Sequence, residues 1–213
     1  RAGDALFEED SKFILVEFKK SHSIKGQSQE KSKFEYGLNG KFNNFDKVNK
    51  VLSSLSDHHF MVYGKSLVSD DLIINASNYF NYLTSTIKSI ELITKDPLKL
   101  NDFGVPKELF DLYIILFVWF KAQPNTKGEG DATCEFEFEK IFGKSNSLVG
   151  IKNKKGLKII PFITYLDFIW TQRFKNDIKK TLTKDNLKNI LEKLNKDYTE
   201  HKKSIKKRVR GIS

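Results

Sequence analysis

Several residue types are scarce in this sequence, and each scarcity excludes a class of protein. Only one cysteine, Cys134, occurs in 213 residues, which excludes an internal disulfide and fits a reducing cytoplasm. With only four histidines, a structural zinc site is not expected. No apolar run reaches the roughly 18 residues of a membrane span, and no signal peptide is visible at the start. We therefore expect a cytoplasmic protein without a membrane segment; the absence of a first Met fits a fragment or a processed form.

Positive charge is what the sequence has in excess. The net charge is +10, and residues 175–210 hold 13 Lys and Arg against 5 Asp and Glu, so most of the excess lies in that stretch. A basic field of this size favours polyanions such as nucleic acid. A solvated basic helix is the alternative interpretation of the same run. The C-terminal cations predicted to contact nucleic acid are Lys202, Lys203, Lys206, Lys207, Arg208 and Arg210.

The first twenty residues carry the most specific pattern. Ala5–Phe7 and Lys12–Lys19 are predicted to form two antiparallel strands joined by an acidic turn. Because successive strand residues face opposite sides, Glu17 and Lys19 share one face. Ile14, Val16 and Phe18 share the other, which we expect to face a core. An acid and a base thus lie side by side at the end of a strand.

Apolar spacing and turn residues predict the remaining elements. A polar loop is expected over 21–40 and another over 143–156, with a possible boundary at 123–131. Strands are expected at 59–63 and 134–138. Helices are expected at about 43–55, 69–90 and 107–121, after Pro161 within the segment 159–181, and from Thr183 onward. The expected class is α/β (α+β), with a core in residues 1–65 and a mostly helical extension over 66–213.

Gly3-Asp4, followed thirteen residues later by Glu17-Phe18-Lys19 at the end of Phe13–Val16, resembles the signature of the PD-(D/E)xK, or restriction-endonuclease-like, nucleases. The resemblance covers about residues 3–65, whose predicted order strand, strand, helix, strand matches the second half of that family's mixed-sheet core. It implies that Asp4 and Glu17 bind a divalent metal and that Lys19 assists the attacking water. Lys20 is a further candidate contact to a phosphate.

Elementary chemistry agrees with those roles. Mg²⁺ prefers carboxylate oxygens and often keeps open positions for water and substrate phosphates. The backbone carbonyl of Phe18 is a further candidate ligand, and Mn²⁺ is the alternative ion. An ammonium beside the metal, here that of Lys19, stabilises developing negative charge.

The sequence departs from the family where the core should begin. The family has a helix and a strand before the Asp, whereas only three residues precede Asp4. Those elements come either from a missing N-terminal portion or from another segment or chain. The polar residues Gln27 and Gln29 in the expected loop are weak candidates for supporting the site, since ordinary loop polarity explains them as well.

These observations predict a Mg²⁺-dependent nuclease acting on DNA, with RNA as an open alternative. Restriction, repair and defence against phage are the contexts suggested by analogy. The second hypothesis is a non-catalytic subunit that binds nucleic acid through the basic C-terminal helix. A second copy of the chain or a partner subunit is an expected partner. His58 and His59 do not form a chelating pair if they lie on a strand, because neighbours face opposite sides.

Overall fold

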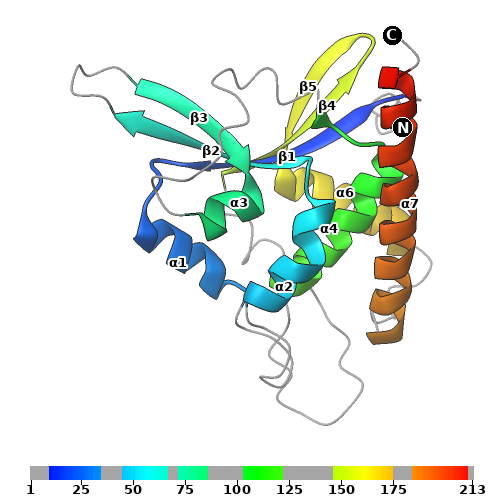
Figure 1. Cartoon of the computed structure of the whole chain (residues 1–213), viewed down its shortest axis with the longest axis horizontal. Coiled ribbons are helices and arrows are strands. Elements are labelled where there is room, and N and C mark those ends of the chain that lie inside the picture. The colour runs from blue at the N-terminus through cyan, green and yellow to red at the C-terminus, as the bar shows by residue number, and fades with distance from the viewer. Residues whose placement is uncertain are drawn as a thin grey trace.

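The computed structural model describes residues 10–34, 45–66, 72–85, 103–121, 146–174 and 184–210. Within these ranges the chain combines one five-stranded mixed sheet with helices, so the expected coarse α+β class is confirmed (Figure 1). Three of the five strands come from residues after 66, which means that the sheet draws on both parts of the predicted domain division.

Strand β1, Lys12–Lys19, is the centre of the sheet, whose order is β3-β2-β1-β4-β5. It runs parallel to β2, His59–Ser66, and antiparallel to β4, Ser147–Asn153. Strands β3, Leu72–Asn78, and β5, Gly156–Pro161, complete the two edges in antiparallel pairing. Parallel pairing of β1 and β2 requires a crossover, which the helices between them provide.

Both edges of β1 are occupied, and this corrects the predicted hairpin. On one edge Lys12 to Glu17 pair with β4. On the other, β2 pairs from Leu15 onward, and Phe13 exchanges two backbone hydrogen bonds with Val105, of 2.8 and 3.1 Å. Pairing of Ala5–Phe7 with the start of this strand is therefore wrong, because a strand has only two edges. Residues 5–7 themselves lie outside the described ranges.

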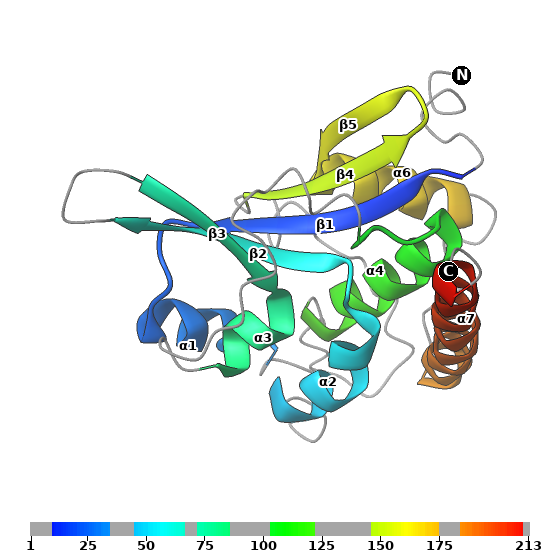
Figure 2. The ribbon, with the colours of Figure 1, turned by 45° about the horizontal axis from the view of Figure 1, so that its top comes forward.

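The helices of the described chain lie on one face of the sheet, and the main core is there (Figure 2). From β1, Phe13 and Leu15 belong to that core, and Glu17 and Lys19 follow them on the same face. Ile14 and Val16 belong to a smaller cluster on the opposite face. Phe18, also on that face, is 41% exposed. Ile14 and Val16 thus face a core as predicted, although it is the smaller one, whereas the prediction is wrong for Phe18. The charged pair lies on the face that the helices cover (Figure 2).

The loop expected over 21–40 contains a helix, α1, Ile24–Ser32. Ser23 caps it by accepting a hydrogen bond from the Gly26 amide at 3.0 Å. The buried residues of α1 are Gln27 and Glu30, both polar. Because no apolar stripe marks its buried face, hydrophobic periodicity did not indicate the helix.

Two further expectations need correction. Where a helix was expected from 69 to 90, the described residues 72–85 form strand β3 followed by α3, Tyr79–Thr84. Asn78 accepts hydrogen bonds from the amides of Phe80 and Asn81. The side chain of Asn78 thus stops the strand and starts the helix. The loop expected over 143–156 contains β4, which lies between two strands. Its apolar run is too short to have indicated a strand by itself.

Other expectations are confirmed. Helix α2, Phe45–Leu52, with the 3₁₀ turn η3, Ser53–Leu55, matches the predicted 43–55 segment, and β2 begins at His59 as expected. Helix α4, Lys107–Lys121, follows Pro106, and α6, Phe162–Phe174, follows Pro161. The predicted strand at 134–138 and the boundary at 123–131 lie outside the described residues.

The last helix, α7, Lys184–Arg210, packs on α4 and η3. Leu194 and Tyr198 are buried, whereas Ile205 is exposed. His58, fully buried, lies in T-shaped contact with Phe110 and Tyr113 of α4 and 6.2 Å from the Tyr198 ring. No helix in the described part of the chain has the length and apolar character that a membrane span requires.

Acid should weaken this packing through His58. Burial, with smaller effects from His59 and His201, holds its pKa well below 6.5, and neither ring nitrogen has a hydrogen-bond partner. The unfolded chain therefore binds this proton first, so stability is complete above pH 6.5 and is lost as the pH falls. Between pH 7 and pH 5 the free energy of unfolding should fall by about 1–2 kcal/mol less in His58→Phe than in the wild type, as measured by urea unfolding. Equal losses in both proteins would contradict this.

Candidate functional site

Glu17 and Lys19 lie at the carboxyl end of β1, where the core becomes polar. Glu17 is opposite Ser147 of β4 and Met61 of β2. Its side chain is buried, whereas that of Lys19 is 29% exposed. Because alternate residues of β1 share a face, the same face that places Leu15 in the apolar core places Glu17 and Lys19 in a charged site.

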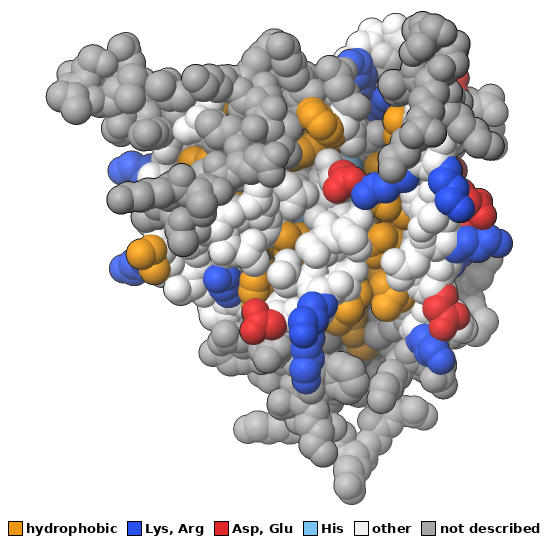
Figure 3. Space-filling view, viewed as in Figure 1, with side chains coloured by type: hydrophobic (Ala, Val, Ile, Leu, Met, Phe, Trp, Pro, Cys, Tyr) orange, Lys and Arg blue, Asp and Glu red, His pale blue; other side chains and the backbone are white. Residues whose placement is uncertain are grey.

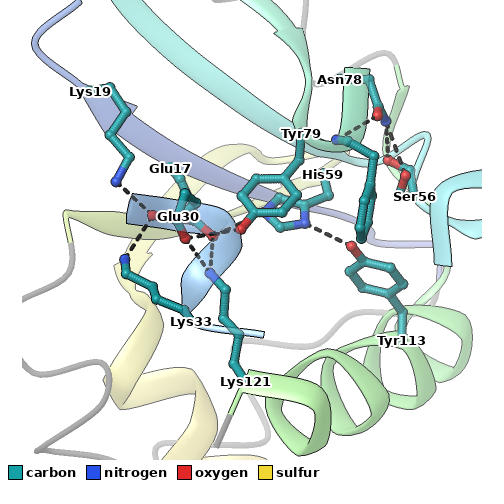
Figure 4. A network of polar contacts seen from close by, with 11 residues as sticks. Glu17, Lys19, Glu30, Lys33, Ser56, His59, Asn78, Tyr79, Tyr113 and Lys121 are labelled. Atoms are coloured by element: carbon teal, nitrogen blue, oxygen red, sulfur yellow. Dashed lines mark hydrogen bonds and ion pairs between the residues drawn. The ribbon is translucent and has the colours of Figure 1, made fainter. Parts of the chain in front are cut away.

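Glu30 of α1 is the centre of this site (Figure 4). Its Oε2 accepts hydrogen bonds from the ammonium groups of Lys19 at 2.8 Å and Lys33 at 2.7 Å. Its Oε1 accepts from Lys121 at 2.7 Å and from the Tyr79 hydroxyl at 2.9 Å. One carboxylate, only 1% exposed, thus joins β1, α1, α3 and the end of α4.

Lys121, the last residue of α4, links the two carboxylates. Its Nζ lies 3.2 Å from Glu17 Oε1 and 2.7 Å from Glu30 Oε1, and its side chain is 3% exposed. The ammonium also lies over the rings of Phe117, Tyr79 and Phe34, at 4.4, 5.0 and 5.4 Å from their centroids. Cation–π attraction of this kind is strongest in desolvated positions.

His59 completes the network on the side of Glu17. Its Nε2 lies 3.3 Å from Glu17 Oε1, and its Nδ1 is hydrogen-bonded to the Tyr113 hydroxyl at 2.7 Å. The imidazole stacks on Tyr79, with ring centroids 4.0 Å apart. Burial lowers the pKa of His59 more than the contact with Glu17 raises it, so the ring is neutral at pH 7.

Both carboxylates are ionised despite their burial. Burial by itself raises the pKa of Glu30, but the ammonium groups of Lys121, Lys33 and Lys19 outweigh it and hold this pKa well below the ordinary value. For Glu17, burial and the neighbouring Glu30 oppose Lys121 and His59, and the pKa is lowered. Burial lowers the pKa of Lys121, but the carboxylates of Glu17 and Glu30 outweigh it, and this pKa is raised. The site is therefore held together by full charges.

A cavity of about 260 Å³ opens beside these residues. It lies where the end of β1, the start of β4 and the end of α1 meet. Its lining residues are Glu17, Phe18, Lys19, Lys20, Lys33, Asn146 and Ser147. The cavity is accordingly bounded by one carboxylate, three lysines and polar groups of β4, a composition suited to an oxyanion.

The structure brings together Glu17, Phe18, Lys19 and Lys20 of the predicted site. Asp4 lies outside the described residues, and its role as a metal ligand stays a prediction. Within the described ranges no group of three His, Cys, Asp or Glu side chains is arranged to hold a metal ion. Of the two glutamines weighed as supports, Gln27 donates to the backbone carbonyls of Tyr82 and Ser85 and so attaches α1 to α3.

The predicted basic surface of α7 is described only in part. Lys202 lies 2.7 Å from an Asp57 carboxylate oxygen and 3.3 Å from the Ser54 carbonyl, so it joins α7 to the η3 region. Lys203 is exposed. The side chains of Lys206, Lys207, Arg208 and Arg210 lie outside the described set, and their contact with nucleic acid stays a prediction.

Sequence reasoning missed Glu30, Lys121 and the part played by His59. Glu30 lies in a segment without apolar periodicity. Lys121 ends a helix that is apolar almost throughout. A single cation at the end of such a run is a signal in the sequence that could have indicated a buried ion pair. No sequence pattern links it to Glu17, because the two lie 104 residues apart.

No protein-family model, no curated protein and no solved structure matches this chain. The residues of the site itself are therefore the basis for a functional proposal.

Removal of the Lys121 ammonium should be strongly destabilising. Lys121→Met keeps most of the side-chain volume but leaves two buried carboxylates without their shared cation, which costs about 3–5 kcal/mol. On the same helix, Lys107→Met removes a partly exposed i,i+4 pair with Asp111 and a cation–π contact with the Phe168 ring at 5.6 Å, and should cost about 1 kcal/mol. Urea unfolding at pH 7 measures both.

A double variant separates the ion pair from packing. If Lys121 acts mainly by compensating Glu30, adding Glu30→Gln to Lys121→Met should cost less than the sum of the single changes. Additive costs would show that the two groups do not depend on each other.

Proposed function

We propose that this protein is a metal-dependent nuclease of the PD-(D/E)xK type, with Glu17 and Lys19 in its active site. The observation that carries the proposal is that both residues line one polar cavity at the end of a central strand. An acid for a cation and an ammonium for developing negative charge therefore lie at the same opening.

The arrangement of the sheet gives further support. The segment from β1 to β2 forms strand, helices and parallel strand, which agrees with the last three elements of the order strand, strand, helix, strand that the resemblance implies. The antiparallel neighbour on the other edge of β1 is β4, from more than a hundred residues later. This favours the alternative that another segment of the same chain supplies core elements expected before Asp4.

The described residues are suitable for part of a Mg²⁺ site. Glu17 offers a hard carboxylate oxygen, and Phe18, Asn146 and Ser147, which line the same cavity, carry oxygen atoms of the kind that Mg²⁺ accepts. Glu17 uses Oε1 for both Lys121 and His59, and Oε2 takes no part in those contacts. Asp4 is proposed as the second carboxylate. When bound, the ion would polarise the phosphodiester and make a bound water more acidic.

Lys19 is proposed to stabilise negative charge on the reacting phosphate. Its ammonium is held by Glu30 at 2.8 Å and reaches the cavity wall. A held cation needs little rearrangement when charge develops, which is the basis of electrostatic stabilisation of a transition state. Glu30 is accordingly a positioning residue that acts through Lys19.

DNA is the proposed substrate, with RNA the alternative, and C-terminal cations are proposed to contact the backbone. In Figure 3, Lys and Arg side chains lie beside Asp and Glu side chains along the side where α7 runs. Among the ion pairs of α7 are Lys193 with Asp197 at 2.6 Å and Lys202 with Asp57. Of these cations, we expect exposed Lys203 to contribute more to phosphate binding than Lys202.

Cleavage of plasmid DNA and of RNA with Mg²⁺ or Mn²⁺, compared with EDTA, tests the proposal. We expect metal-dependent cleavage that falls by at least about 100-fold in Glu17→Gln and in Lys19→Met, because each removes a charge at the reacting centre. Lys12→Met is the matched control, since Lys12 is an exposed lysine at the opposite end of β1. Its cleavage rate should equal that of the wild type.

Urea unfolding of each variant shows whether the fold is retained. Cleavage that survives in folded Glu17→Gln and Lys19→Met would overturn the site assignment. A wild-type protein that binds nucleic acid but cleaves neither DNA nor RNA with either metal would favour the non-catalytic subunit.

A further inference from the structure

The cavity at the end of β1 has an excess of positive charge that the buried network does not balance. Among the residues that the structure describes, two carboxylates, of Glu17 and Glu30, face the four ammonium groups of Lys19, Lys20, Lys33 and Lys121. Lys121 is buried between the carboxylates, so the excess lies with the three lysines at the opening. A cluster of cations that outnumbers the carboxylates paired with it, in a partly enclosed space, favours an anion.

Glu30 holds two of these lysines beside each other. Lys19 and Lys33 bond the same oxygen, Oε2, from the end of β1 and the end of α1. Figure 4 shows both approaching Glu30 from one side and Lys121 from the other. An ammonium has three donor hydrogens, so each lysine keeps donors for a ligand after bonding Glu30. Their side chains are 29% and 48% exposed, which leaves them accessible from the opening.

The wall opposite the lysines is supplied by β4. Ser147 is paired with Glu17 in the sheet and is 5% exposed, and Asn146 precedes it at the rim. A hydroxyl and an amide are donors that suit phosphate oxygens. The volume of about 260 Å³ is several times the roughly 30 Å³ that one water occupies in the liquid, so a phosphoryl group fits with some of its hydration.

We propose that this cavity binds a phosphoryl group without metal, through Lys33 and Ser147 in addition to Lys19. The inference rests on the proposed function for the identity of the substrate, a nucleic acid. The phosphoryl group has two sources, a terminal phosphomonoester or an internal phosphodiester. Lys33 directly follows α1 and Ser147 begins β4, so neither is part of the Glu-x-Lys motif.

Binding measured in EDTA separates this inference from catalysis. Inorganic phosphate is titrated calorimetrically against the full chain. Short single-stranded oligonucleotides with and without a 5′-phosphate are titrated by fluorescence anisotropy at fixed ionic strength. We expect Lys33→Gln to weaken phosphate binding by about tenfold and Ser147→Ala by about threefold. The matched control is Lys25→Gln, an exposed lysine of the same helix outside the cavity, which should stay within about twofold of the wild type.

A preference for the 5′-phosphorylated oligonucleotide that disappears in Lys33→Gln would identify a terminal phosphate as the ligand. Equal binding of both oligonucleotides, weakened equally by Lys33→Gln, would identify the internal diester. Equal losses in Lys33→Gln and Lys25→Gln would overturn the inference, because the effect would then be general charge. If Lys33-dependent binding holds while no metal-dependent cleavage is found, the proposed function fails and this site stands.

Discussion

The ion pairs of Lys121 with Glu30 and Glu17 are the constraint on which the rest of the structure depends. Isolated charges are costly to bury, and these groups are buried deeply. They are compensated only when β1, α1 and the end of α4 lie together, and Tyr79 adds α3 through its hydrogen bond to Glu30. Any arrangement that moves one of these elements leaves a charge without its partner. The network therefore favours one packing of segments that are far apart in the sequence.

Within the same network, polarity and exposure increase from the protein interior to the cavity. At its inner end, His59 is neutral and the aromatic rings around Lys121 exclude water. At its outer end, Lys19 and Lys33 share a carboxylate oxygen and face a cavity. Rigid support behind and cationic groups in front are what a site for a phosphate ester requires. One set of interactions thus serves the fold and the proposed chemistry together.

The success of sequence reasoning followed the strength of local signals. Helix α4 and strand β1 were predicted well because length, a leading proline or regular alternation marked them. Helix α1 was missed since it buries Gln27 and Glu30 in place of apolar residues, and α3 with β3 was merged into one helix across the Asn78 cap. Hydrophobic periodicity does not predict a helix whose buried face is polar, because the partners that make burial of those polar side chains favourable lie elsewhere in the chain.

The sequence by itself determined that Glu17 and Lys19 share one face of a strand, since alternation is a property of the extended backbone. It also determined the strong positive charge and the absence of an internal disulfide. Only the tertiary structure decided which face of β1 the helices cover, and that β4 fills its second edge. It alone also decided that Lys121 compensates Glu17 across 104 residues. These outcomes depend on how segments far apart in the sequence pack together. That packing must bury apolar surface and pair the buried charges at the same time, and no local sequence pattern predicts it.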